Sequence, residues 1–488
     1  MSNTSRTKKV LLLSFGQTFN KIAFLISGII AARILTKQDY ATLKQTLLVY
    51  NSISPLLVLG LTSVPYYFLP KEKENKKSVI INNLTLLFLM ALIFSIFLKL
   101  DGYKLIAHYF DNPNLIDTLK WMIPYPLFVI PVGILSSVLL VQNKTYILTN
   151  YQIISNLILV ILIVLGIYLT KNYTGPLIAQ IYFPLILFPI AMWLIFKFVP
   201  GRFTLPKIEK MIEMLKYSVP LGIASMMGML MLQTDKIIVS SMTSTEDFAN
   251  YINGAIEIPL IGIITGSIAS VILVDMVKYI DQGKKLEALV LFKKAALKSA
   301  TILFPIMIFL LFLSKDFILT LYSDKYIESV LPFTIYLFIL PVRIVVYGSA
   351  LMALGFSKVI MFRSFFDLLF NILLSILMVK WLGYIGAAIA TILTLYIWTV
   401  PFNLYQIAKG FNVRILDILP IKDLLKVLFI SLLPIPLILI NINFYNYNYL
   451  LQLIISFFIY FPIVFYLLYK NSLFEIPDKY LKVFKGNK

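Results

Sequence analysis

The sequence is short of three residue classes: it has no cysteine, one histidine and few charged residues. The missing cysteines exclude disulfide bonds, thiolate metal sites and cysteine nucleophiles. The single histidine, His108, lies outside every long apolar run, so a histidine metal cluster or proton relay cannot form within those runs. Charged residues make up 14%, whereas ordinary soluble domains contain about a quarter. A glycine-rich phosphate loop of the Walker type is also absent, which disfavours direct ATP hydrolysis.

Apolar residues dominate instead, at 60% of 488 residues with a mean hydropathy of +0.89. A helix needs about 20 apolar residues to cross a bilayer. The runs that meet this template are 10–35, 41–68, 79–98, 121–141, 147–169, 176–196, 219–242, 249–274, 299–313, 330–354, 365–382, 385–407, 424–440 and 449–468. The first follows a basic start with no cleavage pattern, so we interpret it as an uncleaved span. The sequence predicts an all-α polytopic membrane protein with about fourteen transmembrane helices, within a range of twelve to fourteen.

The net charge of +20 is explained by topology. Cytoplasmic loops of membrane proteins carry an excess of lysine and arginine. With the amino terminus inside, most of the 43 lysine and arginine residues fall in cytoplasmic segments, and the alternation never inverts. We therefore expect a protein of the inner (cytoplasmic) membrane with both termini in the cytoplasm, and no nucleic-acid partner. The basic segment 277–298 is either an amphipathic helix on the membrane surface or a plain connector.

A weak internal similarity indicates two repeats. QDYATLKQ, starting at Gln38, resembles EDFANYIN, starting at Glu246, at a spacing of 208 residues. Both segments fall on the outer turn between the first two spans of a six-span block. Because six is even, the blocks keep the same orientation, as in parallel transporter repeats. We predict a six-helix lobe at 1–198, a cytoplasmic linker at 199–216, a second six-helix lobe at 217–408, and two additional helices with a basic tail at 409–488.

Five ionisable residues lie deep inside the apolar runs, namely Lys21, Asp235, Lys236, Glu257 and Arg343. A charge at that depth costs about 2.5–3.5 kcal/mol on insertion scales, and it persists where it faces a watery path through the protein. We expect Lys21, Lys236 and Arg343 to point into one central cavity and bind an anion, since arginine suits phosphate in a bidentate fork. Asp235 and Glu257 are the candidates to carry a coupling H⁺ or Na⁺. For Asp235 and Lys236, a purely structural pairing with neighbouring helices stays open.

Polar residues on the same helix faces are expected to line that cavity. At helical spacing, Gln17 shares the face of Lys21, with Asn20 beside it, and Gln233 shares the face of Lys236. Gln152 and Asn156 follow one face of the fifth run.

One further acidic residue has a local explanation. Asp367 stands four residues after Arg363, which predicts an i,i+4 ion pair at the membrane interface.

The segment ARILTKQDYATLKQTLLVYNSISPLLVLGLTSVPYYFLP, from Ala32 to Pro70, and its counterpart from Thr234 to Pro259 resemble one family. They are similar to the Wzx-type polysaccharide flippases of the multidrug/oligosaccharidyl-lipid/polysaccharide (MOP) exporter superfamily. This resemblance implies two six-helix bundles around a central cavity, working by alternating access. It also implies an undecaprenyl-pyrophosphate-linked repeat unit of O-antigen or capsule as cargo. Family turns usually carry glycine where Ala41 follows Tyr40, so the substrate subgroup stays open.

Other functions remain possible at this point. Within transport, a peptidoglycan-precursor flippase or a multidrug antiporter of the same superfamily is the alternative. From another class, a membrane glycosyltransferase or O-antigen polymerase has similar hydropathy but needs a larger outer loop. We expect a monomeric non-enzyme without cofactor, apart from a coupling ion. Its expected partners are the lipid-linked glycan, membrane lipids, and a polysaccharide polymerase and export proteins.

Overall fold

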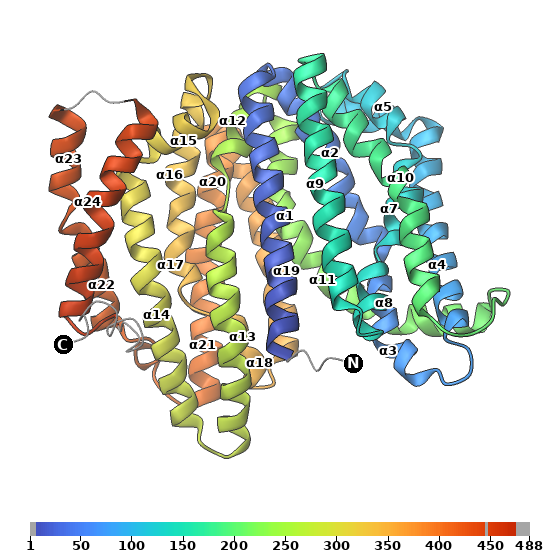
Figure 1. Cartoon of the computed structure of the whole chain (residues 1–488). Coiled ribbons are helices and arrows are strands. Elements are labelled where there is room, and N and C mark those ends of the chain that lie inside the picture. Colours follow the sequence, from blue (N-terminus) through green and yellow to red (C-terminus); the bar gives the residue numbers. More distant parts are fainter. Residues whose placement is uncertain (1–5, 445–447, 475–488) are drawn as a thin grey trace, which may run out of the picture. The chain divides into compact units, whose positions relative to one another are not determined.

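The computed structural model describes residues 6–444 and 448–474 (Figure 1). Within these ranges, the side chains of 6–15, 17, 224, 259, 260, 263, 270, 443 and 444 are left out of the description. The described residues form helices and no strands, which confirms the all-α prediction. The chain divides into two compact units, Met1–Ala249 and Asn250–Lys488.

The first unit is built mainly around four pairs of packed helices: α1 with α9, α9 with α10, α2 with α11, and α4 with α7. Its elements are α1 (Arg6–Ile34), α2 (Lys37–Val58), η1 (Leu61–Ser63), α3 (Val64–Lys71), α4 (Lys76–Phe97), η2 (Leu98–Gly102), α5 (Tyr103–Tyr109), α6 (Leu115–Trp121), α7 (Tyr125–Val132), α8 (Leu135–Val141), α9 (Thr145–Thr170), α10 (Thr174–Phe198) and α11 (Ile208–Met242). Helix α12 (Thr245–Gly254) crosses the boundary into the second unit.

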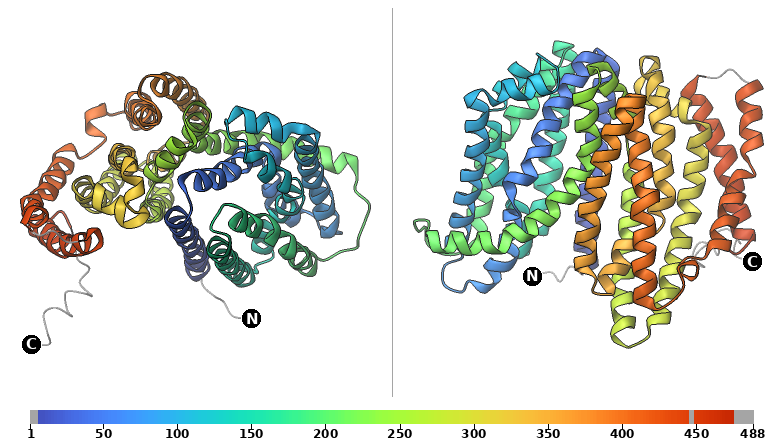
Figure 2. Two further views of the ribbon diagram at one scale, coloured as in Figure 1. Left: turned by 90° about the horizontal axis from the view of Figure 1, so that it is seen from above. Right: turned by 180° about the vertical axis from the view of Figure 1, so that it is seen from behind.

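The second unit is organised around two pairs of packed helices, α13 with α14 and α19 with α20. The helices of each pair lie side by side in Figure 2. Its elements are α13 (Pro259–Asp281), α14 (Lys285–Phe312), α15 (Ser314–Tyr322), η3 (Asp324–Ser329), α16 (Val330–Tyr336), η4 (Leu337–Ile339), α17 (Leu340–Arg343), α18 (Tyr347–Ala353), α19 (Ser357–Leu382), α20 (Tyr384–Leu393), η5 (Thr394–Thr399), α21 (Val400–Phe411), η6 (Ile415–Asp417), α22 (Ile421–Leu432), α23 (Ile435–Phe444) and α24 (Tyr449–Lys470). The last two predicted spans, α22–α23 and α24, pack against α14 and α15.

Every predicted apolar run falls on helical structure. In the described residues, nine helices are long and apolar enough to span a membrane, or up to twelve if each bent pair is one span. The bent pairs include α2 with η1–α3, at 60°, and α6 with α7–α8, at 56°. Helices α1 and α13, several of whose side chains are not described, are not in this count. The polytopic fold is confirmed, and the number fourteen stays a prediction.

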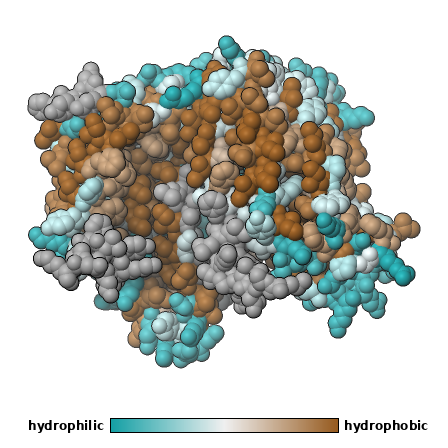
Figure 3. Space-filling view, in the orientation of Figure 1, coloured by the Kyte–Doolittle hydropathy of each residue, from teal (hydrophilic) through white to brown (hydrophobic). Residues whose placement is uncertain are grey.

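The surface of the described helices agrees with a bilayer environment. Large apolar side chains such as Leu169, 82% exposed, and Phe458, 70% exposed, project outward. Figure 3 shows apolar residues gathered over the middle of the helices and hydrophilic residues at their ends. Exposed apolar surface of this extent would be unfavourable in water, so the helices are suited to lipid.

The basic segment 277–298 is not a separate surface helix. It consists of the end of α13, a turn at Gly283 and the first half of α14, which continues into the ninth span. Phe292 is buried, α14 packs against α22, and Lys285 donates a hydrogen bond to the carbonyl of Gly410 at 3.3 Å. The protein itself therefore covers part of this face, through Ala288, Leu289 and Phe292. The segment continues α13 and α14 and is not a separate helix lying on the membrane surface.

The predicted linker 199–216 is partly helical, because α11 begins at Ile208. Its non-helical half is held by two asparagines of the first unit: Asn75 accepts from the backbone N–H of Arg202 at 3.0 Å, and Asn82 accepts from that of Lys207 at 2.6 Å. Helix α11 then packs along α2. The compact unit consequently extends past the predicted lobe boundary, and the repeat boundary itself stays a prediction.

A buried polar network fixes the start of α2 in the first unit. The Asn112 side chain, in the loop before α6, donates to Gln45 at 2.6 Å and to Thr42 at 3.0 Å. Gln45 in turn donates to Ser240 of α11 at 2.9 Å. All four side chains are buried, and their hydrogen bonds offset the cost of removing them from water.

The second unit uses the positions 208 residues later in the same way. Asn250 corresponds to Thr42 and donates to Glu328. Asn253 corresponds to Gln45 and lies next to Tyr326. Glu328 and Tyr326 belong to η3, between the ninth and tenth predicted spans, just as Asn112 lies between the third and fourth. Equivalent positions thus tie a helix to the equivalent loop in each half, which supports a parallel repeat.

Candidate functional site

The eighth predicted span is broken in the middle. Residues 255–258 separate α12 from α13, and Glu257 lies in this break. Pro259 begins α13 and lacks a backbone N–H, and a residue before proline is disfavoured from helical geometry. Accordingly, Ile258 is extended, with φ −66° and ψ 118°. Non-helical backbone at membrane depth occurs where it is buried in protein or lines a cavity, so the break marks a site.

A second break interrupts the tenth predicted span. Arg343 is the last residue of α17, and residues 344–346 separate it from α18. The sequence there, from Val342 to Val346, contains four β-branched residues, which have reduced helix propensity. Arg343 therefore stands at an interruption of its own helix, as Glu257 does.

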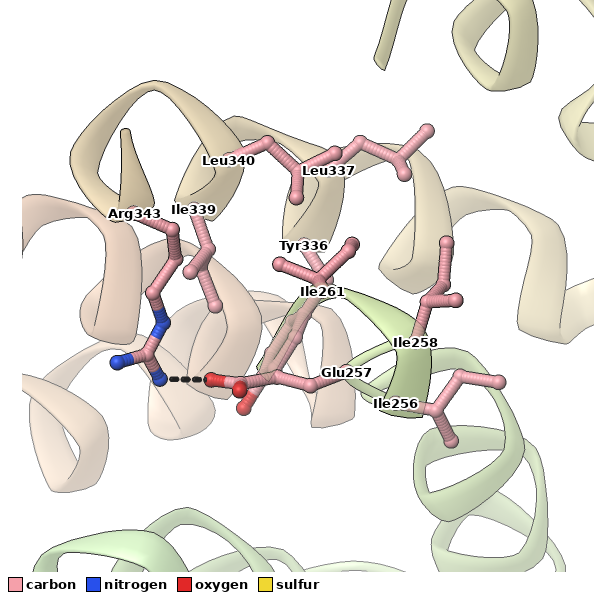
Figure 4. Close-up of a pocket in the computed structure, with 9 residues that line it drawn as sticks. All are labelled: Ile256, Glu257, Ile258, Ile261, Tyr336, Leu337, Ile339, Leu340 and Arg343. Atoms are coloured by element: carbon pink, nitrogen blue, oxygen red, sulfur yellow. Dashed lines mark hydrogen bonds and ion pairs between the residues drawn. The ribbon is translucent and has the colours of Figure 1, made fainter. Parts of the chain in front are cut away.

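The two breaks meet through their charged side chains. Nη2 of Arg343 donates to Oε1 of Glu257, and both side chains are 45% exposed (Figure 4). The pair borders a small hollow that is partly open to the outside. The other lining residues are Ile256, Ile258, Ile261, Tyr336, Leu337, Ile339 and Leu340. In Figure 4 the ring of Tyr336 runs toward the Glu257 carboxylate. The site is therefore an apolar hollow with one ion pair at its edge.

Magnitudes argue against a purely structural role for this pair. A half-exposed ion pair contributes only about 0–1 kcal/mol to stability. Placing each charge within a membrane span costs about 2.5–3.5 kcal/mol on insertion scales. Stability alone would favour two apolar residues at these positions. A guanidinium also carries five N–H donors, so a single carboxylate leaves donors for a ligand.

The remaining predicted charges belong to the first unit. Lys21 is exposed on α1. Lys236, on α11, is half-buried and donates to the Leu232 carbonyl at 2.9 Å. Asp235 is buried and accepts from the backbone N–H of Lys236 at 2.9 Å. The structure thus brings together Glu257 and Arg343 within one unit. A cavity shared by Lys21, Lys236 and Arg343 stays a prediction.

Lys44 is a cation that the sequence analysis missed. It is half-buried on α2, and its Nζ lies 3.3 Å from the place where a Cβ at Gly28 of α1 would stand. It also experiences repulsion from the positive charge of Lys236. The absence of a side chain at Gly28 therefore gives the ammonium group its room. One signal was available in the spacing, because Gly28 stands seven residues after Lys21, two helical turns along the same face of α1.

The residues proposed to line the cavity have mixed surroundings. The side chain of Gln17 lies outside the described residues. Asn20 is half-buried, and its Oδ1 is buried without a hydrogen-bond partner in the described part of the chain. Gln152 donates to Ser136 of α8 at 3.4 Å. The last two, Asn156 and Gln233, are half-buried. Their role as cavity lining stays a prediction.

The predicted ion pair between Arg363 and Asp367 is confirmed, with Nε and Oδ2 3.2 Å apart. It is more buried than a pair at the membrane interface would be, since the Asp367 side chain is 3% exposed. Thr399 donates to the Asp367 carboxylate at 2.7 Å, and Arg363 donates to Asn403 at 3.3 Å. The pair therefore joins α19 to η5 and α21. Across the described residues, no group of three or more acidic or histidine side chains is placed to hold a metal ion.

Comparison with known proteins gives the family and the fold. The family described as polysaccharide biosynthesis protein matches residues 30–331. An uncharacterised membrane protein of Methanocaldococcus jannaschii is 23% identical over 410 residues, which cover 80% of this chain and 95% of that protein. Among solved structures, the lipid II flippase MurJ in an inward closed conformation has a TM-score of 0.73 at 21% identity, covering 95% of this chain and all of that one.

More distant structures show the same fold. A MOP superfamily transporter from Pyrococcus furiosus has a TM-score of 0.58 at 12% identity, covering 83% of this chain and 96% of that one. An inward-facing multidrug resistance MATE family transporter of the MOP superfamily has a TM-score of 0.59 at 12% identity, covering 82% and 98%. The fold expected from the sequence, that of the MOP superfamily transporters, is confirmed.

Proposed function

The chain belongs to the polysaccharide biosynthesis protein family, and we propose that it is a lipid-linked oligosaccharide flippase. Its cargo is an undecaprenyl-pyrophosphate-linked repeat unit, which it moves from the inner to the outer leaflet of the cytoplasmic membrane. The observation that carries this proposal is the Glu257–Arg343 pair, which lies at two helix breaks beside an apolar hollow. A charged group next to an apolar wall suits an anionic lipid better than a soluble metabolite.

The proposed mechanism is alternating access with the head group held by cations. Arg343, Lys21 and Lys236 neutralise the pyrophosphate through charge-assisted hydrogen bonds, and Lys44 adds a fourth positive charge. Lysine supplies a point charge, and arginine supplies a planar fork that matches phosphate oxygens. No covalent step is needed, so the protein acts as a transporter and not as an enzyme.

Asp235 and Glu257 are proposed to couple transport to a gradient of H⁺ or Na⁺. Asp235 is buried beside Lys236, and Glu257 faces the hollow. Transport by the Asp235→Asn protein is expected to lose most of its dependence on pH or Na⁺. Unchanged dependence in that variant would exclude this residue from coupling.

A peptidoglycan-precursor flippase is the second candidate function. The observation in its favour is the similarity to the lipid II flippase MurJ over 95% of the chain. A multidrug antiporter is less well supported, because the neighbouring cations Lys44 and Lys236 repel an organic cation. Membrane lipids, a polysaccharide polymerase and export proteins are the proposed partners of the flippase, which acts as a monomer.

Deletion of the gene followed by mass analysis of lipid extracts tests this proposal. We expect polyprenyl-pyrophosphate-linked glycan to accumulate and to disappear when the intact protein is restored. Accumulation of lipid-linked peptidoglycan precursor in its place would support the second candidate. An unchanged lipid profile would contradict both.

A further inference from the structure

We propose that Glu257 is a placeholder anion: its carboxylate occupies Arg343 while the hollow is empty, and the lipid-proximal phosphate of the cargo displaces it. This inference rests on the proposed function and adds a regulatory role for one residue of the same site. It starts from the observed pairing of two half-exposed side chains in one hollow.

Carboxylate and phosphate compete for the same donors. Both present oxygen atoms that accept parallel N–H bonds from a guanidinium. A pyrophosphate carries more charge than a single carboxylate and therefore attracts Arg343 more strongly at equal distance. Because the existing pair is 45% exposed on both sides, solvent screens it and exchange of one anion for another is easy.

The rest of the hollow suits the carbon atoms next to that phosphate. Its wall includes Ile256 and Ile258 from the first break, Ile261 from the first turn of α13, and Leu337 and Leu340 from the facing segment (Figure 4). Burial of apolar carbon atoms against this wall is favourable, because it removes them from water. A prenyl phosphate would therefore satisfy the charged edge and the apolar wall together, whereas inorganic phosphate would satisfy the edge alone.

Displacement of the Glu257 carboxylate from Arg343 would also release a link between two backbone segments. The pair ties the break at 255–258 to the end of α17, just before the break at 344–346. Non-helical residues at element ends are the positions that absorb changes in φ and ψ during conformational switching. Arrival of the phosphate removes this tie and so couples cargo binding to movement of α13 and α18 within the second unit.

The test is equilibrium binding to the purified full-length protein in detergent, with farnesyl phosphate, farnesol and inorganic phosphate as probes. For the intact protein we expect farnesyl phosphate to bind at least tenfold more tightly than either other probe. Glu257→Gln removes the competitor and should tighten farnesyl phosphate binding about two- to fivefold, as expected for loss of a half-exposed pair. Arg343→Gln should weaken it at least tenfold.

Two further variants keep the test interpretable. Asp417→Asn neutralises the carboxylate of the Arg414–Asp417 pair, which lies in the same unit but outside the hollow, and should leave binding unchanged. Glu257→Asp keeps the charge on a shorter side chain and should give an affinity between those of the intact protein and Glu257→Gln. Each protein is compared only after showing the same elution profile as the intact one.

Two results would overturn the placeholder role. One is unchanged or weaker binding of farnesyl phosphate in Glu257→Gln. The other is binding of inorganic phosphate as tightly as farnesyl phosphate. If either occurs while the deletion strain accumulates lipid-linked glycan, the placeholder role fails and the flippase function stands. If binding behaves as expected and no glycan accumulates, the flippase function fails and the placeholder role stands for another prenyl phosphate.

Discussion

Glu257 and Arg343 are 86 residues apart in the sequence, yet their side chains form an ion pair. Each residue lies at an interruption of a different helix, and the breaks belong to one compact unit. A pair in this position is weak in stability terms and costly to insert, as argued above. The presence of this pair in a membrane span is best explained by a charged ligand that binds the same two side chains.

Removing the central cations should abolish export without preventing membrane insertion. In Arg343→Ala and Lys21→Ala cells we expect surface polysaccharide to fall at least tenfold, because the pyrophosphate loses a charge partner. Surface polysaccharide and the amount of protein in the membrane are measured together. Arg414→Ala, which removes an exposed arginine paired with Asp417, is the control and should export normally. Normal surface polysaccharide in both test variants would contradict the assignment of these cations.

The buried network around Gln45 should matter for stability. Gln45→Leu leaves Ser240 and Asn112 without one partner each, and an unsatisfied buried polar group costs about 1–3 kcal/mol. Unfolding of the purified protein in detergent should shift to lower temperature by an amount that reflects this loss. Gln38→Leu, on an exposed face of the same helix, is the matched control and should unfold like the intact protein. Equal unfolding temperatures for the two variants would show that the network contributes nothing.

The pH dependence of stability should report on Glu72. Backbone N–H donation from Asn75, followed by the bond from Lys210 at 3.2 Å, lowers the pKa of the Glu72 carboxyl below its ordinary value of 4.5. A lowered pKa in the folded state means that the contribution is complete above pH 4.5 and is lost as pH falls through the folded value.

Glu72→Gln should therefore lower stability by about 0.5–1 kcal/mol at neutral pH and have progressively less effect below pH 4.5. Thermal unfolding across pH 3.5–7 measures this difference. Glu74→Gln, at a neighbouring exposed carboxyl, should show no such dependence. A Glu72→Gln effect that is constant over the whole range would contradict the assigned cause.

The predicted topology can be tested because the chain contains no cysteine. Lys284→Cys and Lys315→Cys introduce single exposed thiols near the two ends of α14. In intact cells, a membrane-impermeant maleimide should label the thiol at position 315 and reach the thiol at position 284 only after lysis. Labelling at position 284 in intact cells would invert the orientation that the lysine and arginine distribution predicts.

Local sequence signals predicted the helices and the local ion pair, but not the contacts between distant residues. Every predicted apolar run falls on helical structure, and i,i+4 spacing located the Arg363–Asp367 pair, because both signals depend on neighbouring residues. Pro259 indicated a helix break next to Glu257, but the continuous apolar run around it favoured an unbroken span. The pairing of Glu257 with Arg343 depends on tertiary packing, which no periodicity encodes. Lys44 was missed because it stands near the end of a predicted span, where lysine residues are common and do not indicate a buried charge.

Transport by the purified protein tests the central claim most directly. Proteoliposomes are prepared with a polyprenyl-pyrophosphate oligosaccharide in their membrane, and an ion gradient is applied. A membrane-impermeant glycosidase is added outside, and cleavage of glycan that began in the inner leaflet is followed over time. The account predicts that the intact protein and Arg414→Ala expose this glycan, while Arg343→Ala vesicles and protein-free vesicles do not. Exposure by Arg343→Ala at the intact rate, or no exposure by the intact protein, would contradict it.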